Sequence, residues 1–270
     1  MNRLAQNIRP AAVAGKFYPA EPSRLGPMVE AFLEQAPSQA AQNPKAVIAP
    51  HAGYVFSGPI AGSAFRSWVK PARGIRRIVL LGPSHFVAFP GIALPRAAGF
   101  ATPLGIARID GEAVKQLEAL SQVRQFQPAH EAEHCLEVEL PFLQQLFSDF
   151  TIVPLVTGQA TEEEVRETVD ALWGGEETRF VISSDLSHYH DYETARRMDR
   201  STAAAIEGAR SEPLSANEAC GHLAIRGFLK AARQRGLGAR LLDLRNSGDT
   251  AGPRDSVVGY GAFVFEQGRS

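Results

Sequence analysis

Two kinds of apolar pattern alternate along this chain. Short apolar runs bounded by glycine, proline or polar residues predict strands over residues 45–50, 76–82, 150–156, 179–184, 239–245 and 257–265. The longer segments between and around them predict helices over residues 22–35, 58–68, 110–120, 133–147, 161–173, 193–208 and 215–235. Because strands alternate with helices, we expect one α/β domain over residues 1–270, with a central, mostly parallel or mixed sheet flanked by helices.

Three further segments refine this picture. Residues 90–105 are rich in Gly and Pro, which predicts short antiparallel strands or hairpins. Residues 36–44 form a polar connector that ends in a proline and carries a second one near its start. The helix over residues 133–147 is the best defined, because its apolar residues recur at helical spacing: Leu136, Leu140, Leu143 and Phe147.

Composition narrows the functional classes. The chain carries 28 basic and 29 acidic residues, a net charge of -1, so it has no general attraction for phosphate backbones or anionic lipid. We interpret the group Arg73, Arg76 and Arg77 as the solvated lead-in to a strand rather than a nucleic-acid site. Since no segment has the composition of a signal peptide or a membrane span, we expect a cytoplasmic protein without nucleic-acid or membrane partners.

Several chemistry-bearing residues follow predicted strands. His51 follows the run 46–49, His85 follows the run 78–81, and Asp185 follows the run 180–183. In an open α/β sheet, ligands bind at the carboxyl ends of the strands. Imidazole and carboxylate groups brought there from separate strands predict a metal pocket or an acid–base site. The simpler alternative for each histidine is a loop side chain that caps a carbonyl group.

The densest cluster is Ser183-Ser184-Asp185-Leu186-Ser187-His188-Tyr189-His190. Asp185 and His188 are close enough in sequence for the carboxylate to orient the imidazole, or for both to face a metal or substrate. The serines also suggest a Ser–His–Asp hydrolase, but the chain has no G-x-S-x-G elbow before a helix. We interpret His190 as solvent-facing or structural.

Two more segments hold candidate groups. His134 and Glu137 share a face of the helix predicted over residues 133–147, either as site residues or as part of an N-terminal cap. Cys220 begins a predicted helix, where a thiol pKa is lowered toward the metal-binding thiolate; a core cysteine is the alternative. His222 is a possible outer group of that site. We interpret Cys135, which has no charged partner on its face, as buried filler.

The motifs together resemble the Memo family, whose prokaryotic members are also called AmmeMemoRadiSam system protein B. The resemblance covers nearly the whole chain through the segments 9–19, 50–54, 82–85, 133–141, 183–188, 220–221 and 246–260. Phe17 stands where many relatives carry Trp. The family is similar in fold to the class III extradiol dioxygenases of the LigB type, which implies an α/β architecture around a nonhaem metal site.

The resemblance also implies roles for individual residues. His51, His85 and Cys220 take the metal-ligand positions, with Asp185 and His188 beside them as the acid–base pair, and His134, Glu137 and Tyr54 fall at the pocket. The implied metal is iron or copper. A thiolate in place of the carboxylate of a two-His-one-carboxylate iron site is softer, which favours copper or general redox work over ring-opening dioxygenation.

Three functions remain open at this stage. The first is a metal-dependent redox enzyme that acts on an unknown substrate. The second is a non-catalytic binding or adaptor module, which the family name links to radical-SAM and AMMECR1-domain partners. The third is an extradiol-type dioxygenase, which depends on the fold analogy alone.

Overall fold

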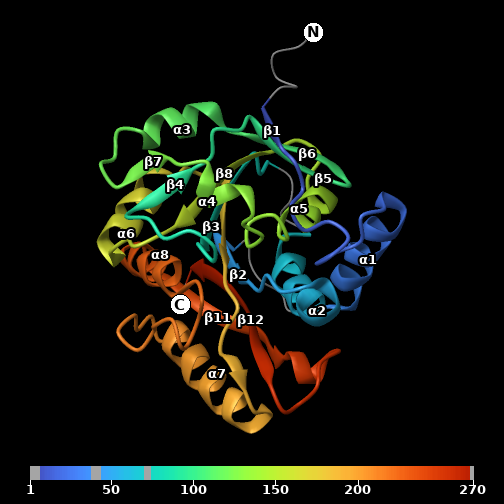
Figure 1. Ribbon diagram of the computed structural model, residues 1–270. Coiled ribbons are helices and arrows are strands. Elements are labelled where there is room, and N and C mark those ends of the chain that lie inside the picture. Colours follow the sequence, from blue (N-terminus) through green and yellow to red (C-terminus); the bar gives the residue numbers. More distant parts are fainter. Residues whose placement is uncertain (1–6, 38–43, 70–73, 268–270) are drawn as a thin grey trace.

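One mixed sheet with helices on both faces forms the protein (Figure 1). The computed structural model describes residues 7–37, 44–69 and 74–267. In this part of the chain the strands are β1 (Ile8–Arg9), β2 (Ala46–Ala49), β3 (Arg77–Pro83), β4 (Ile92–Leu94), β5 (Gly99–Thr102), β6 (Gly105–Ile109), β7 (Val123–Gln125), β8 (Thr151–Thr157), β9 (Thr178–Ser183), β10 (His188–His190), β11 (Leu237–Asn246) and β12 (Val257–Gln267). The helices are α1 (Pro22–Gln35), α2 (Tyr54–Phe65), α3 (Gly111–Leu117), α4 (Pro128–Glu131), α5 (Leu140–Leu146), α6 (Glu162–Ala171), α7 (Tyr192–Glu207) and α8 (His222–Gln234), with 3-10 turns at Arg66–Trp68 and Ser247–Asp249.

Parallel strands occupy the middle of the sheet. β9 pairs in parallel with β3 on one side and with β2 on the other, and β8 extends the parallel set beyond β3. β12 is antiparallel to both β2 and β11. The order across the sheet is β1-β5-β6-β8-β3-β9-β2-β12-β10. The prediction of an α/β fold with a central mixed sheet is therefore confirmed.

Alternate residues of the central strands enter two different cores, because successive side chains of a strand point to opposite faces. Val47 and Ala49 of β2 pack in the core that α1, α2 and α5 cover. Ala46 and Ile48 pack in the core that α3, α6, α7 and α8 cover. Burial on both faces explains why the central strands are continuous apolar runs in the sequence. Figure 1 shows α1 and α2 on one side of the sheet and α6 and α8 on the other.

Local capping fixes the starts of several helices. Thr161 and Glu164 form a capping box at α6, and the side chain of Asp110 accepts backbone N–H groups at the start of α3. Asp191 does the same for α7. These side chains satisfy N–H groups that have no partner inside the first turn. The observed starts therefore lie close to the predicted ones.

The helix predicted over residues 133–147 is wrong in its first half. Residues 135–139 form turns, and α5 covers only Leu140–Leu146. The carboxylate of Glu133 accepts the backbone N–H groups of His134 and Cys135, which holds this stretch in a turn. Pro141 lies in the first turn of α5, where its missing N–H leaves no helical hydrogen bond unmade.

Smaller differences concern the ends of the elements. α8 begins at His222 rather than near residue 215, and β1, β7 and β10 are only two or three residues long, too short for a periodicity signal. The antiparallel hairpin expected in residues 90–105 begins there with β5 and continues beyond that segment as β6. Residues 38–43 of the connector and Arg73 lie outside the described residues.

No helix in the described part of the chain is long and apolar enough to cross a membrane.

Candidate metal centre

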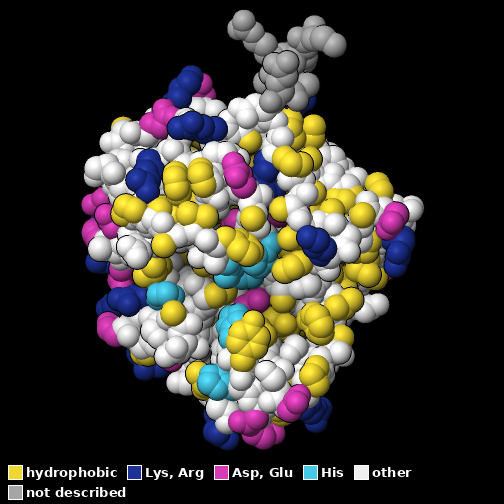
Figure 2. All heavy atoms as spheres, in the orientation of Figure 1, with side chains coloured by type: hydrophobic (Ala, Val, Ile, Leu, Met, Phe, Trp, Pro, Cys, Tyr) yellow, Lys and Arg dark blue, Asp and Glu magenta, His cyan; other side chains and the backbone are white. Residues whose placement is uncertain are grey.

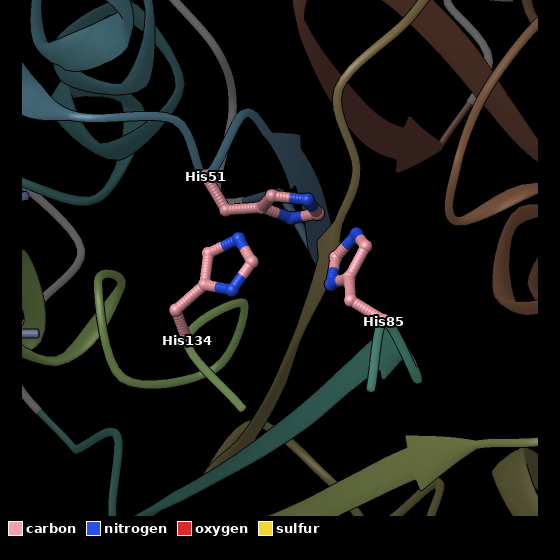
Figure 3. Close-up of side chains that lie close together, drawn as sticks. All are labelled: His51, His85 and His134. Carbon is pink, nitrogen blue, oxygen red and sulfur yellow. The ribbon is translucent and has the colours of Figure 1, made fainter. Parts of the chain in front are cut away.

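Three predicted site residues leave the sheet at neighbouring strand ends. His51, His85 and Asp185 each come two residues after the last residue of β2, β3 and β9. Because β9 lies between β2 and β3 and all three are parallel, their carboxyl ends share one edge of the sheet. Figure 3 shows the rings of His51 and His85 close together, joined by that of His134.

Two glycines allow other segments to approach this edge. A Cβ at Gly82 of β3 would lie 2.6 Å from Sγ of Cys135, so glycine lets the turn after Glu133 pack against the strand. A Cβ at Gly221 would lie 2.7 Å from Cβ of Ser184, so glycine lets the segment with Cys220 approach the end of β9. These close contacts are possible only for a residue without a side chain.

His51 is buried, and close contacts on both ring nitrogens and on its backbone N–H hold it in place. Its Nδ1 lies 2.7 Å from Oγ of Ser183, and its Nε2 lies 3.3 Å from Sγ of Cys220. Its backbone N–H donates to Oδ1 of Asp185 at 2.8 Å. Burial, together with the neighbouring histidines, lowers the pKa of His51 well below its usual value, so the ring is neutral at neutral pH.

His85 is held by a carboxylate that the sequence analysis did not single out. Its Nδ1 lies 2.9 Å from Oε1 of Glu133, and its backbone N–H donates to Oε2 of Glu133 at 2.7 Å. Burial raises the pKa of Glu133, but the hydrogen bonds that it accepts from the ring and the backbone N–H of His85 outweigh burial and hold that pKa at about 2. Glu133 directly precedes His134 in the sequence, yet its partner His85 is remote in sequence, so spacing gave no signal for this pair.

His134 completes a set of three rings, which we call the histidine cluster (His51, His85 and His134). Its ring stacks on that of His85 with 4.7 Å between centroids, and it contacts Phe17. Burial lowers the pKa of His134 to about 4, so this ring is also neutral at neutral pH. Ligand atoms of all three histidines lie within 4.8 Å of one another, a spacing that can hold a metal ion.

Cys220 lies against the histidine cluster but is not a thiolate here. Its Sγ accepts the backbone N–H of Asp185 at 3.3 Å in addition to its contact with His51. Burial and the charge of Asp185 raise the pKa of Cys220 to about 12, which contradicts the expectation of a lowered thiol pKa. The reason is position: Cys220 precedes the cap residue Gly221, so burial outweighs any effect of the α8 dipole.

Asp185 and His188 line the same cavity, but the carboxylate does not orient the imidazole, which was one of the two arrangements expected. Burial raises the pKa of Asp185 to about 7, and its carboxylate accepts the backbone N–H of His51. His188 is half-buried on β10, where the carbonyl of Leu186 orients its ring. Among the described residues, no hydrogen bond joins Asp185 to His188. His188 lies on β10, which pairs with β12 at the edge of the sheet, whereas Asp185 follows β9 in its middle.

Glu137 and Tyr54 do not line the cavity, contrary to the position expected for them. Glu137 is fully buried, where it pairs with Arg9 at 2.5 Å and accepts the hydroxyl of Tyr18 at 2.7 Å. We call Arg9, Tyr18 and Glu137 the N-terminal anchor. The Tyr54 hydroxyl donates to the carbonyl of Val138. Residues 133–139 do not form a helix, and the hydrogen bonds of Glu137 hold the N-terminal segment in place.

One large cavity surrounds these groups. It has a volume of about 920 Å³ and is lined by the histidine cluster, Asp185, His188 and Cys220, with Lys16 and Phe17 from the N-terminal segment. Figure 2 shows histidine side chains gathered in a hollow beside hydrophobic ones. Tyr189 at the cavity and Phe86 beside His85 are 78% and 62% exposed, so the rim carries aromatic surface open to solvent.

His190 also lines this cavity, whereas His222 contacts the carbonyl of Ala219 and is not among the lining residues. Cys135 is buried and donates to the carbonyl of Pro83, in agreement with its interpretation as filler. The arginines at the start of β3 pair with neighbouring carboxylates: Arg77 with Asp110, and Arg76 with Asp149.

Comparison with known proteins places these features in a family. Residues 9–264 match the family described as Memo-like protein. A MEMO1 family protein of Aquifex aeolicus is 33% identical over 96% of this chain and 99% of the relative, and one of Archaeoglobus fulgidus is 34% identical with the same coverage. One of Nitrosopumilus maritimus is 32% identical, again with that coverage.

A solved structure extends the comparison to the fold. The crystal structure of an uncharacterized protein from Escherichia coli K12 matches 81% of this chain and 98% of that chain, with a TM-score of 0.52 and 15% identity. At this identity the likeness concerns the fold alone. The match over residues 9–264 and the full-length relatives together show that this chain belongs to the Memo family.

Proposed function

We propose that this chain binds a redox-active transition-metal ion, iron or copper, and uses it in an oxidation or reduction of a substrate held in the cavity. The observation that carries the proposal is the convergence of ligand atoms from His51, His85 and His134 within 4.8 Å. Neutral imidazole is the commonest metal ligand in proteins, and burial keeps His51 and His134 neutral.

The hydrogen bonds of the rings support metal binding. A metal-bound histidine generally donates its other ring N–H to a carboxylate or another oxygen, which orients the ring. Nδ1 of His51 contacts Ser183 and Nδ1 of His85 contacts Glu133, so Nε2 of each ring is available for a ligand bond. The donor set present therefore fits a transition metal.

Two side chains can complete the ligand set of His51 and His85. Cys220 is the ligand that the family resemblance implies, and its Sγ lies 3.3 Å from Nε2 of His51. Its high pKa means that a metal ion must displace the thiol proton, which links binding to proton release. His134 is the alternative on proximity alone. A thiolate would favour copper, whereas a third imidazole suits iron, copper or zinc.

The cavity also holds groups that can move protons. A bound iron or copper ion would supply one-electron chemistry at the ends of β2 and β3. Asp185, with a pKa of about 7, can release or take up a proton near neutral pH. His188 faces the same cavity and is the second group that we propose for proton transfer.

Metal analysis of variants tests this proposal. Protein purified without chelator should contain iron or copper, and His51→Ala should lose it. His222→Gln is the matched control, because it also removes an imidazole but from outside the cavity. Anomalous scattering at the iron and copper edges would identify the ion. The proposal fails if the wild-type protein holds neither metal and His51→Ala binds added metal equally well.

A binding module is the second candidate, and the exposed aromatic rim favours it. Phe86 and Tyr189 offer apolar surface to a partner beside the cavity. Radical-SAM and AMMECR1-domain proteins are the partners that the family resemblance suggests. Pull-down with those partners using His85→Ala separates the two functions: unchanged binding favours the module, whereas oxygen consumption that requires His85 favours the enzyme.

A further inference from the structure

A buried carboxyl group lies beneath the histidine cluster without any part in the function proposed so far. Glu139 is completely buried just before α5. Its Oε1 lies 2.8 Å from Oγ of Ser183, whereas its Oε2 has no hydrogen-bond partner among the described residues. The charged group that bears on Glu139 is Asp185, which has the same sign. Among the described residues, no cation is found to act on Glu139 and compensate a negative charge.

The hydroxyl of Ser183 has three close partners. Its Oγ lies 2.7 Å from the carbonyl oxygen of Cys135, 2.8 Å from Oε1 of Glu139 and 2.7 Å from Nδ1 of His51. A serine hydroxyl has one hydrogen to donate and two lone pairs to accept with. A backbone carbonyl can only accept, so the hydrogen of Ser183 goes to Cys135. Both remaining partners, Glu139 and His51, must then donate.

We propose that Glu139 is a neutral carboxylic acid that donates to Ser183, and that Ser183 and Glu139 are positioning residues that hold His51 as the Nδ1–H tautomer. In this arrangement the two lone pairs of Ser183 are filled by Glu139 and by Nδ1–H of His51. The lone pair of His51 then lies on Nε2, which faces Sγ of Cys220 at 3.3 Å.

The ionised alternative is costly. An anionic Glu139 would compete with the Cys135 carbonyl for the single hydrogen of Ser183 and would leave a charged oxygen buried without a partner. A neutral acid leaves only an uncharged carbonyl oxygen in that place. Burial also raises the pKa of Glu139 well above its usual value, in agreement with the neutral form.

The consequence for metal binding rests on the proposed function, whereas the protonation state of Glu139 and the tautomer of His51 do not. The Nδ1–H tautomer is the one that can ligate a metal through Nε2 without loss of its hydrogen bond to Ser183. Two experiments on the metal-free protein therefore come first, and metal binding follows as a separate measurement.

Infrared difference spectroscopy tests the neutral acid. The wild-type spectrum minus that of Glu139→Gln at neutral pH should contain the carbonyl stretch of a protonated carboxylic acid. In Ser183→Ala this band should move, because the acid loses the oxygen to which it donates. A difference spectrum that shows only carboxylate bands would overturn the proposal.

Nitrogen-15 NMR of histidine-labelled protein tests the tautomer, with the resonances of His51 assigned through their loss in His51→Gln. The wild-type ring should be protonated at Nδ1, and Ser183→Ala should populate the Nε2–H form. Ser183→Thr keeps a hydroxyl and should restore the wild-type signal, as should Glu139→Gln, whose amide also donates. A wild-type ring protonated at Nε2 would contradict the proposal, even if a variant failed to fold.

Titration with copper or ferrous ion alone completes the test. Loss of an outer hydrogen-bond partner weakens metal affinity by about 10- to 100-fold, which is the effect expected for Ser183→Ala. Ser67→Ala is the matched control, because Ser67 is a buried serine that donates to the Ala64 carbonyl and is not among the residues that line the cavity. A tautomer change without loss of affinity would overturn the positioning role. If the wild type binds no metal, the proposed function fails while the infrared and NMR results still decide the protonation states.

Discussion

Glu133 and Glu137 are four residues apart in the sequence and both are buried, yet their roles differ. Glu137 stabilises the fold, whereas Glu133 holds a side chain of the candidate site. Glu137, in the N-terminal anchor, accepts hydrogen bonds from Arg9, Tyr18 and two backbone N–H groups, so both its oxygens are satisfied within the protein. Glu133 supports the histidine cluster, whose rings keep nitrogen atoms available to a ligand. Burial and charge are common to the two regions. What separates a structural cluster from a chemical one is whether hydrogen-bonding capacity is left over.

The largest expected effect is on stability, through Glu137→Ala in the anchor. Removal of one partner from a buried ion pair leaves the Arg9 charge uncompensated and costs about 3–5 kcal/mol of unfolding free energy. Urea denaturation measures this loss, with Glu112→Ala as the control because its pair with Lys115 is exposed. The folded fraction of Glu137→Ala should still bind metal. Equal stability losses for both variants would show that the anchor is not structural.

The next largest effect is the loss of stability at acidic pH, which we expect from His130. This residue is buried and neutral, and its backbone carbonyl accepts a hydrogen bond from Arg9 of the N-terminal anchor. Its Nε2 donates to the Ala93 carbonyl at 3.0 Å, and burial lowers its pKa to about 4. Unfolded histidine titrates near pH 6.5, so between these values the unfolded chain binds a proton that the folded chain does not. Stability should therefore fall as the pH drops from about 6.5 to about 4, by about 3 kcal/mol from this group.

His130→Gln can still donate to the Ala93 carbonyl but does not titrate, so it should show a smaller loss of stability over that pH range. Denaturation midpoints at several pH values measure the difference. Parallel profiles for the wild type and His130→Gln would contradict the assignment to this residue.

Glu133→Gln should show the reverse of Glu137→Ala. Glu133 accepts two N–H groups of His85, one from the backbone and one from Nδ1 of the ring. A glutamine amide has a single accepting oxygen, so it cannot accept both, and the ring is no longer held for a ligand. Metal affinity should fall about 10- to 100-fold, with a smaller loss of stability than Glu137→Ala causes. Metal titration and denaturation of the same samples separate the two effects. A metal affinity that matches the wild type would remove Glu133 from the site.

The smallest effect concerns the rim of the cavity. Tyr189 has a φ of 61°, in the left-handed region, and its side chain is largely exposed. A non-glycine residue pays about 1–2 kcal/mol for that conformation, so Tyr189→Gly should raise the melting temperature slightly. Ala209, with a φ of 50°, gives the control Ala209→Gly away from the cavity. If only Ala209→Gly stabilises the protein, Tyr189 makes compensating contacts at the rim.

The sequence allowed prediction of those parts of the site that depend on neighbouring strands. His51, His85 and Asp185 follow apolar runs, and the rule that ligands bind at strand ends places them together without any coordinates. Glu133 was missed because its contact with His85 depends on a turn that replaces the predicted helix. The same helix error placed Glu137 beside His134, since helical periodicity in Leu136 and Leu140 does not reveal a start at Leu140.

Residue type also failed to predict protonation. Cys220 was expected to be a thiolate because it was placed at the start of a predicted helix, but burial is a three-dimensional property that outweighs position along the chain. The role of Ser183 was hidden for a similar reason. Its partners come from two other parts of the chain, Cys135 and Glu139 from the turn before α5 and His51 from the end of β2, and they meet only when the sheet has formed.

The strand order β3-β9-β2 sets the time at which the site can exist during synthesis. The ribosome releases His51 and His85 long before residues 178–183, yet β9 must insert between their two strands before the carboxyl ends of all three align. Parallel pairings over such sequence separations form late in folding. A nascent or truncated chain that lacks β9 therefore has no aligned histidine cluster, and under the proposed function metal capture would be restricted to chains that have completed the sheet.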